Sequence, residues 1–270
     1  MTEAQTDHCP SLLFFDTGVG GLSVLEETRK LLPHAPIVYA ADYAGLPYGM
    51  KSEAELAARV PALLGRLVER YKPTLVTIAC NTASTIALDH VRSALNIPVV
   101  GTVPAIKSAS AITETDVIGL LGTQATIRQP YVDRLAANFA ADKTLLRHAA
   151  PDLVYAAEAK LRGERPDGNV IKAAMSGLLD QPGGENIDTV ILACTHFPLL
   201  REELVEAAQR PIAFIDGAQG IARRIAYLTK DICWPAESRD GIFVTTGDLA
   251  DISAYRSAFG RYGIRQFEQL

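Results

Sequence analysis

Short apolar runs recur along the chain, and segments with helical periodicity follow them. The runs end in Gly, Asp or Cys, a pattern typical of buried parallel strands in βα units. Alternation of strands with helices predicts an α/β fold with mostly parallel sheet. The predicted strands are Ser11–Phe15, Ile37–Ala40, Leu75–Ala79, Val99–Val103, Val117–Leu121, Val190–Ala193 and Ile212–Ile215.

The segment from Ser52 to Tyr71 is the clearest predicted helix. Its apolar residues recur every three or four positions and form one amphipathic stripe. Ser52 and Glu55 are spaced as a capping box at its start. Pro61 inside the segment predicts a kink, because proline cannot donate a backbone hydrogen bond.

A weak internal repeat is the most informative pattern. The run Leu75–Thr82 is similar to Thr189–His196, and each is an apolar strand that ends in a cysteine before a helix. Upstream, Leu12–Gly18 is similar to Val117–Thr123, at a comparable separation. Two similar α/β halves would bring the carboxyl ends of their strands to a shared crevice, where open α/β sheets bind ligands.

The end of the chain lies outside this repeat. Gly241–Thr246 is predicted as a strand and Asp248–Tyr262 as a helix. We therefore predict two similar doubly wound parallel-sheet domains that face each other across a cleft, the second inserted into the first. The first domain would comprise residues 1–102 and 216–270, and the second residues 103–215.

Composition narrows the class of protein. The 270 residues include 26 Lys and Arg against 31 Asp and Glu, for a net charge of −5, so no bulk positive field favours nucleic acid as a partner. No apolar run approaches the roughly 18 residues of a membrane-spanning helix. The segment Met1–Pro10 is polar and unlike a secretion signal. We expect a soluble, cytoplasmic protein with no membrane partner.

The four cysteines are too sparse for a disulfide framework and include no Cys-x-x-Cys pair. A cysteine at a strand end is most often a small apolar core residue. Cys80 and Cys194, however, occupy matching places in the repeat, each before a helix N-terminus that would lower a thiol pKa. Cys9 and Cys233 are interpreted as structural.

Two thiols on opposite sides of a cleft suit one reaction. One thiolate removes a proton from carbon while the other thiol donates a proton to the opposite face, which inverts a stereocentre without a cofactor. His196, two residues after Cys194, is either a core histidine or a neighbour that tunes a base. A Cys-x-His pair alone predicts no metal site.

The segment Asp16–Gly21 is rich in glycine, but it lacks the third glycine of a dinucleotide fingerprint and the lysine of a phosphate loop. No second Asp-Thr/Ser-Gly exists, which excludes an aspartic protease pair. Either the segment is a plain tight turn, or its N–H groups and the Thr17 hydroxyl hold a small carboxylate while Asp16 binds an ammonium or orients a thiol. Pro47–Gly49 is also readable as a plain turn.

Four motifs in order resemble the glutamate racemase family of the aspartate/glutamate racemase superfamily, and the resemblance runs from about Leu13 to Leu228. The motifs are Phe14–Leu25, Pro47–Gly49, Ala79–Ser84 and Ala193–Leu200. The family implies a cofactor-independent racemase that interconverts L- and D-glutamate and supplies D-glutamate for peptidoglycan. It implies no bound cofactor and no metal.

Roles carry over from the resemblance residue by residue. Cys80 resembles the thiol that works on D-glutamate and Cys194 the thiol that works on L-glutamate, while Asp16 and His196 resemble the groups that assist them. Residues that resemble substrate-binding groups, or in the case of Glu158 a glutamate near the second thiol, are Thr17, Pro47, Tyr48, Gly49, Asn81, Thr82, Thr123, Thr126, Glu158 and Thr195.

One residue departs from the family pattern, and the hypothesis has alternatives. Gly217 stands where the family usually has Ser, which affects only a peripheral contact. The run Val99–Lys107 resembles the subgroup activated by a cell-wall precursor. Candidate partners are therefore glutamate, such an activator and a second copy of the chain in a homodimer. The alternatives are a racemase of aspartate or another acidic amino acid, or a catalytically silent amino-acid-binding protein on the same scaffold.

Overall fold

The computed structural model of the protein describes residues 9–270. Its strands form two sheets, and all pairings between these strands are parallel. The strands are β1 (Leu12–Asp16), β2 (Ile37–Ala41), β3 (Leu75–Ile78), β4 (Val99–Gly101), β5 (Val117–Gly122), β6 (Thr144–Ala149), β7 (Thr189–Ala193), β8 (Ala213–Ile215), β9 (Gly241–Thr245) and β10 (Ile264–Gln269). The first sheet has the order β10-β9-β2-β1-β3-β4 and the second β6-β5-β7-β8.

Helices connect these strands. The α-helices are α1 (Leu22–Leu31), α2 (Glu53–Tyr71), α3 (Asn81–Ala94), α4 (Ile106–Ile112), α5 (Gln124–Ile127), α6 (Pro130–Phe139), α7 (Asp152–Leu161), α8 (Gly168–Leu179), α9 (Arg201–Ala208), α10 (Ala218–Leu228), α11 (Leu249–Ile252) and α12 (Arg256–Arg261). Short 3₁₀ turns are η1 (Tyr43–Gly45), η2 (Tyr48–Met50), η3 (Gly184–Asn186), η4 (Phe197–Leu200) and η5 (Ser253–Tyr255). No helix within residues 9–270 has the length and apolarity needed to cross a membrane.

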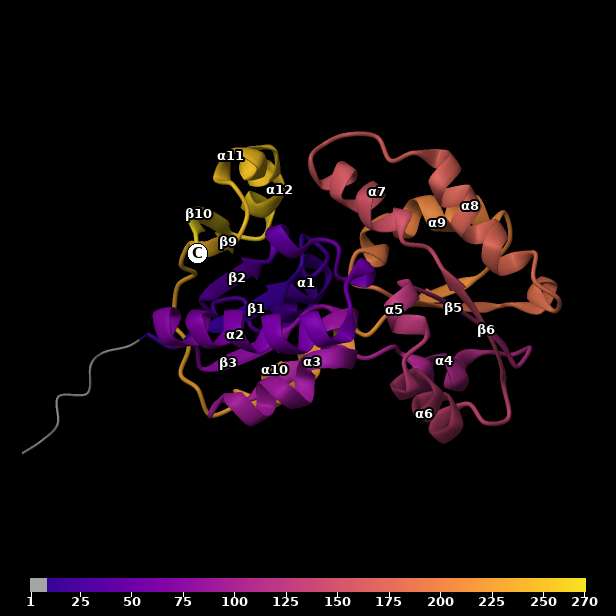
Figure 1. The fold of residues 1–270 in the computed structure, drawn as a ribbon, viewed down its shortest axis with the longest axis horizontal. Coiled ribbons are helices and arrows are strands. Elements are labelled where there is room, and N and C mark those ends of the chain that lie inside the picture. Colours follow the sequence, from indigo (N-terminus) through magenta and orange to yellow (C-terminus); the bar gives the residue numbers. More distant parts are fainter. Residues whose placement is uncertain (1–8) are drawn as a thin grey trace, which may run out of the picture.

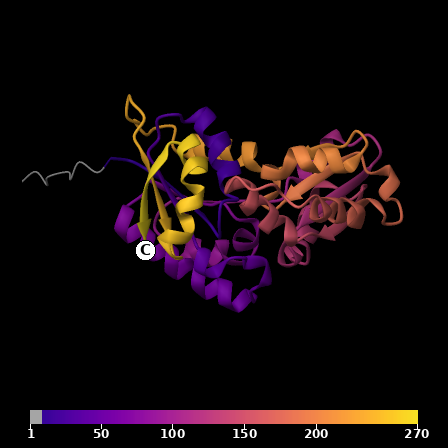
Figure 2. The same cartoon turned by 90° about the horizontal axis from the view of Figure 1, so that it is seen from above.

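The two sheets lie in two lobes, side by side along the long axis of the molecule (Figure 1). Strands β1–β4 belong to the first sheet, β5–β8 to the second, and β9 and β10 return to the first, so the chain crosses between lobes twice. Figure 2 shows the C-terminal segment packed on the first lobe. This arrangement confirms the α/β fold with two parallel-sheet halves, one inserted into the other. The residue boundaries of the two domains stay a prediction.

Each sheet is covered on both faces, as a doubly wound fold requires. In β1, Leu12 and Phe14 belong to a core with α1, α10 and α12, whereas Leu13 and Phe15 belong to a core with α2 and α3. The second sheet likewise separates a core with α7, α8 and α9 from a core with α4 and α6. Burial on both faces explains why the strands have continuous apolar sequences instead of alternating ones.

The internal repeat is visible in the topology. The order β2-β1-β3-β4 in the first sheet corresponds strand for strand to β6-β5-β7-β8 in the second. In each set the connections diverge in opposite directions from the two central strands, which creates a switch point between β1 and β3 and another between β5 and β7. Such switch points are where open α/β sheets bind ligands.

Several sequence predictions need correction. The sequence does not predict strands β6 and β10, because β6 carries polar residues and is half-buried in most positions, and β10 is mostly polar with only Ile264 fully buried. The predicted single helix Asp248–Tyr262 is broken into α11, η5 and α12. The start of α2 is confirmed: the Ser52 hydroxyl accepts a hydrogen bond from the Glu55 N–H at 3.2 Å. The kink at Pro61 stays a prediction.

Candidate active site

The switch points of the two sheets carry the two matching cysteines. Asp16 is the last residue of β1, and Cys80, separated from the end of β3 by Ala79, is the N-cap of α3. In the second sheet, Thr123 follows β5 and Cys194 follows β7. The fold therefore places one thiol at the equivalent position of each half.

Cys80 and Asp16 form the first half of the site. Asp16 is 1% exposed and Cys80 is 6% exposed, and Asp16 lies near enough to Cys80 for its charge to raise the pKa of the thiol. Burial raises the pKa of Asp16 to about 6, although the charge of His196 and the N–H groups of Thr17 and Gly21 partly counter this rise. The buried carboxyl is thus poised to exchange a proton with a neighbour near neutral pH.

The prediction that a helix N-terminus lowers the pKa of Cys80 is wrong for this structure. The sulfur does cap α3, accepting a hydrogen bond from the Ala83 N–H at 3.5 Å. Burial and the adjacent Asp16 charge outweigh that contact and raise the pKa of the Cys80 thiol well above its usual value. Cys80 therefore rests as a thiol.

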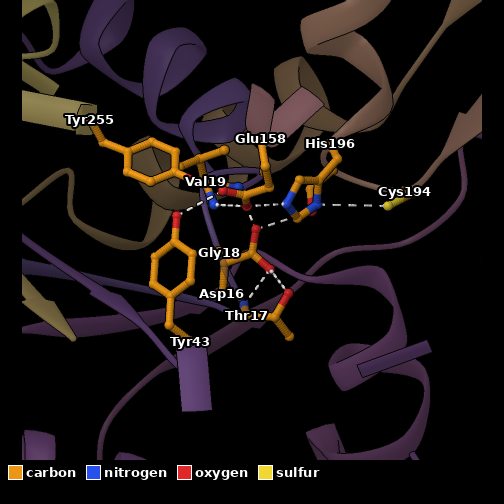
Figure 3. Close-up of polar contacts among 12 residues, drawn as sticks. Asp16, Thr17, Gly18, Val19, Tyr43, Glu158, Cys194, His196 and Tyr255 are labelled. Atoms are coloured by element: carbon orange, nitrogen blue, oxygen red, sulfur yellow. Dashed lines mark hydrogen bonds and ion pairs between the residues drawn. The ribbon is translucent and has the colours of Figure 1, made fainter. Parts of the chain in front are cut away.

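Cys194, His196 and Glu158 form a chain of contacts in the second half (Figure 3). Cys194 Sγ lies 3.9 Å from His196 Nδ1, and His196 Nε2 lies 2.8 Å from Glu158 Oε1. Burial alone would lower the pKa of His196, but its contacts with Cys194 and Glu158 raise it well above the usual value. Burial would raise the pKa of Glu158, but the hydrogen bond to His196 and the charge of His196 hold it below its usual value. His196 is therefore an imidazolium beside Cys194.

The glycine-rich turn binds the protein's own carboxylates. Asp16 accepts hydrogen bonds from the N–H groups of Thr17 and Gly21, and Glu158 accepts one from the Val19 N–H at 2.9 Å. The expectation that N–H groups of this turn and the Thr17 hydroxyl hold a ligand carboxylate stays a prediction. The glycines also serve a close approach, because a β-carbon at Gly18 would collide with the Glu158 carboxylate.

Three threonine hydroxyls bridge the two halves. Thr82 Oγ1 from α3 lies 3.0 Å from Thr123 Oγ1 and 3.3 Å from Thr126 Oγ1, and the last two lie 3.0 Å apart. Beside them, Asn81 Oδ1 is buried and has no hydrogen-bond partner. The cluster offers hydroxyl donors for a carboxylate, and Asn81 offers an acceptor for an ammonium group.

Thr195 and Tyr48 are already bonded within the protein. The Thr195 hydroxyl donates to Asp16 Oδ2 at 3.2 Å, so it joins the halves directly. The buried Tyr48 hydroxyl donates to Asp42 Oδ2 at 2.6 Å. Pro47 precedes Tyr48 as the N-cap of η2, and Gly49 lies against the side chain of Thr123. The structure thus gathers the predicted residues between the lobes, while their individual roles in binding stay predictions.

The site is closed. The side chains of the four catalytic candidates, Asp16, Cys80, Cys194 and His196, are at most 6% exposed, and the cavity that Cys194 lines has a volume of about 10 Å³. A cavity of about 900 Å³ lies at the junction of the halves and is not lined by either thiol. We therefore expect the lobes to separate when a substrate enters. Within residues 9–270, no group of three or more His, Cys, Asp or Glu side chains is placed to bind a metal.

Several residues at the site escaped sequence reasoning. Asp42 is fully buried and accepts hydrogen bonds from Arg59, which fix the turn that carries Tyr48. Its position directly after β2 was a usable signal, because polar residues at strand ends of parallel sheets face the ligand crevice. Tyr43 and Tyr255 also contact the site, and no local sequence pattern identified them.

The sequence of this chain is similar to the sequences of known proteins. The chain matches the model of the Asp/Glu/Hydantoin racemase family over residues 22–225. It is 67% identical to a glutamate racemase of Sphingopyxis alaskensis over 259 residues, which are 96% of this chain and 97% of that protein.

Solved structures of glutamate racemases have the same fold as this chain. Glutamate racemase of Escherichia coli, crystallised with L-glutamate and the activator UDP-MurNAc-ala, has a TM-score of 0.90 at 39% identity and covers 97% of this chain and 98% of its own. The glutamate racemase isoform RacE1 of Bacillus anthracis has a TM-score of 0.82 at 26% identity, covering 97% and 98%.

Fold and site together define the class of protein: an enzyme of racemase type, with two parallel α/β halves and a cysteine at each switch point. The chain belongs to the Asp/Glu/Hydantoin racemase family. The resemblance noted in the four sequence motifs is thereby confirmed.

Proposed function

We propose that this protein interconverts L- and D-glutamate without a cofactor, using Cys80 and Cys194 as the two acid/base groups. The observation that supports this most strongly is the equivalent position of the two thiols at the switch points of two facing sheets. Glutamate as the substrate is supported by the 67% identical glutamate racemase. The product would supply D-glutamate for peptidoglycan.

The proposed mechanism uses the protonation states of the site. L-glutamate loses its α-proton to the Cys194 thiolate, whose negative charge is stabilised by the His196 imidazolium 3.9 Å away. The Cys80 thiol then donates its proton to the opposite face of the carbanion. One C–H bond breaks and another forms, so the net change is inversion at the α-carbon. In the reverse direction the thiols exchange roles.

Binding groups stabilise the carbanionic charge. The Thr82, Thr123 and Thr126 hydroxyls hold a substrate carboxylate, and Asn81 Oδ1 accepts from the ammonium group. Because closure excludes water, each of these contacts acts in a medium of low dielectric, where it is stronger than in bulk solvent. Lobe closure thus both assembles the binding groups and isolates the thiols.

We also propose an anionic activator for the cavity of about 900 Å³ at the junction of the lobes. Six residues of the run Val99–Lys107 line it, and so do Arg223 and Arg224. These cations suit the diphosphate of a nucleotide-linked cell-wall precursor, the kind of activator present in the Escherichia coli complex. The test is racemisation with and without such a precursor; equal rates would remove this part of the proposal.

The experiment that tests the main proposal is incubation of pure, cofactor-free protein with L-glutamate in heavy water. Formation of D-glutamate with deuterium at the α-carbon would support both the substrate and the reaction. L-aspartate is the matched comparison substrate. Racemisation of aspartate but not glutamate, or binding of glutamate without deuterium incorporation, would overturn the proposal.

A further inference from the structure

Glu158 is held from both lobes. Its Oε1 accepts hydrogen bonds from the Val19 N–H at 2.9 Å and pairs with His196 Nε2 at 2.8 Å. Its Oε2 accepts from the hydroxyl of Tyr43 at 2.8 Å. Val19 and Tyr43 belong to the first lobe, whereas His196 belongs to the second. The carboxylate can have all these partners only when the lobes are closed.

Tyr43 has a fixed position in the first lobe. It is the first residue of η1, which Asp42 separates from β2, and the neighbouring Ala44 N–H donates to Thr246 Oγ1 at 3.1 Å. Its ring lies against Tyr255, with the ring centroids 5.8 Å apart (Figure 3). Burial and the Glu158 charge raise the pKa of Tyr43 well above its usual value. Its hydroxyl therefore stays protonated and can donate a hydrogen bond at every pH used in the tests below.

A second contact between the end of α7 and a tyrosine of the first lobe lies one helical turn further along the chain. Arg162, four residues after Glu158, follows the end of α7 and donates from Nη1 to the Tyr255 hydroxyl at 2.8 Å. Its guanidinium also lies 5.7 Å from the centre of the Tyr255 ring. Residues four apart share a helix face. One face at the end of α7 therefore contacts two tyrosines of the other lobe whose rings lie against each other at a tilt.

We propose that Tyr43 is a positioning residue whose hydroxyl, supported by the Tyr255–Arg162 contact, fixes the Glu158 carboxylate against His196 when the lobes close. This inference rests on the proposed function, because it assigns Tyr43 to the thiol that reacts with L-glutamate. It connects lobe closure to proton transfer: closure completes the hydrogen bonds of Glu158, and Glu158 keeps His196 charged beside Cys194.

The pH dependence follows from the groups around Glu158. These are His196, Tyr39, Tyr43 and Tyr255, with Asp16 adjacent to His196 and Arg162 adjacent to Tyr255. Tyr43 donates to the ionised carboxylate and so favours that form. Loss of this hydroxyl raises the pKa of Glu158, and His196 then loses its charged partner at a higher pH than in the unchanged protein.

The first test is Tyr43→Phe, with Tyr155→Phe as the matched control on the exposed side of α7. Tyr43→Phe should reduce kcat from L-glutamate on the order of tenfold, since a buried acceptor loses its donor, and should move the acid limb of that profile upward by about one pH unit. The acid limb of α-proton exchange from D-glutamate should stay in place. Combined with Glu158→Gln, Tyr43→Phe should cause no further loss of kcat.

An unchanged acid limb, or losses that multiply in the double variant, would show that Tyr43 does not act through Glu158. A second readout needs no activity: site-resolved alkylation of each cysteine by iodoacetamide without substrate. Tyr43→Phe should speed modification of Cys80 and Cys194 several-fold relative to the exposed Cys233. If the unchanged protein racemises glutamate but Tyr43→Phe alters neither the acid limb nor alkylation, the positioning role fails alone. If the protein does not racemise glutamate yet Tyr43→Phe exposes both thiols, the proposed function fails while Tyr43 still controls closure.

Discussion

The two thiols occupy topologically equivalent positions but have different chemical surroundings. Cys80 caps a helix and lies near Asp16, a carboxyl whose pKa burial raises to about 6. Cys194 lies beside His196, a cation whose charge is maintained by Glu158. The repeated fold thus brings two sulfurs to one crevice, while the side chains beside each sulfur differ: a carboxyl near Cys80 and an imidazole paired with Glu158 beside Cys194.

We infer from this difference that the two directions of the reaction use different assisting groups. A Cys80 thiol, together with Cys194 beside the His196 imidazolium, suits entry of L-glutamate. For D-glutamate, the Cys80 proton must first be transferred, and we infer that the neighbouring Asp16 carboxylate accepts it. The two directions should therefore depend on different assisting groups and on different pH ranges.

The largest expected effect comes from removal of either thiol. Cys80→Ala and Cys194→Ala should each reduce racemisation by more than about a thousandfold, because each face of the substrate needs its own proton carrier. The measurement is the change in optical rotation of glutamate solutions. Cys233→Ala at an exposed position is the control and should retain full activity. Residual activity above a tenth in either site variant would exclude that thiol from the mechanism.

A smaller effect should separate the two assisting groups. His196→Asn should slow turnover from L-glutamate about a hundredfold and affect α-proton exchange from D-glutamate less, and Asp16→Asn should show the reverse preference. Both rates can be measured by proton NMR in heavy water on the same preparations. Equal slowing of both directions by His196→Asn would mean that His196 is a shared contact or a structural residue.

Removal of one hydroxyl from the cluster of Thr82, Thr123 and Thr126 should weaken binding of both L- and D-glutamate. Thr82→Val should raise KM about tenfold for each enantiomer, since a carboxylate loses one of its donors, while kcat changes little. Thr85→Val is the matched control, because the Thr85 hydroxyl donates to a carbonyl group of its own helix. A change of KM for one enantiomer alone would place Thr82 at one thiol instead of at a shared carboxylate.

The smallest effect is a displacement between two pH profiles. Asp16 must be ionised to accept the Cys80 proton, so exchange from D-glutamate should fall as the pH decreases through about 6. The pKa of Glu158 lies below its usual range, so the acid limb for L-glutamate should lie at lower pH. Initial rates between pH 4 and 9 test this, and coincident acid limbs would contradict the assignment of separate groups.

The sequence predicted the strands whose burial shows in a continuous run of apolar residues, and it predicted the two similar halves of the fold. Continuous apolar runs identified the strands buried on both faces, and the repeat around Cys80 and Cys194 indicated two similar halves. The same repeat could have located β6, which corresponds to β2 in strand order. Strand β10 has no counterpart in the second sheet, and its exposed polar residues give no burial signal.

What the sequence by itself determined is the set of candidate groups: two cysteines at matching strand ends, His196 two residues after Cys194, and Asp16 in the glycine-rich motif. Only the tertiary structure decided their protonation and their partners. Closure of the lobes brings Tyr43 to Glu158 across 115 positions of chain and removes water from Cys80, which reversed the expected direction of its pKa shift. Burial and contacts between distant segments depend on how the lobes pack, and no local pattern of residues records them.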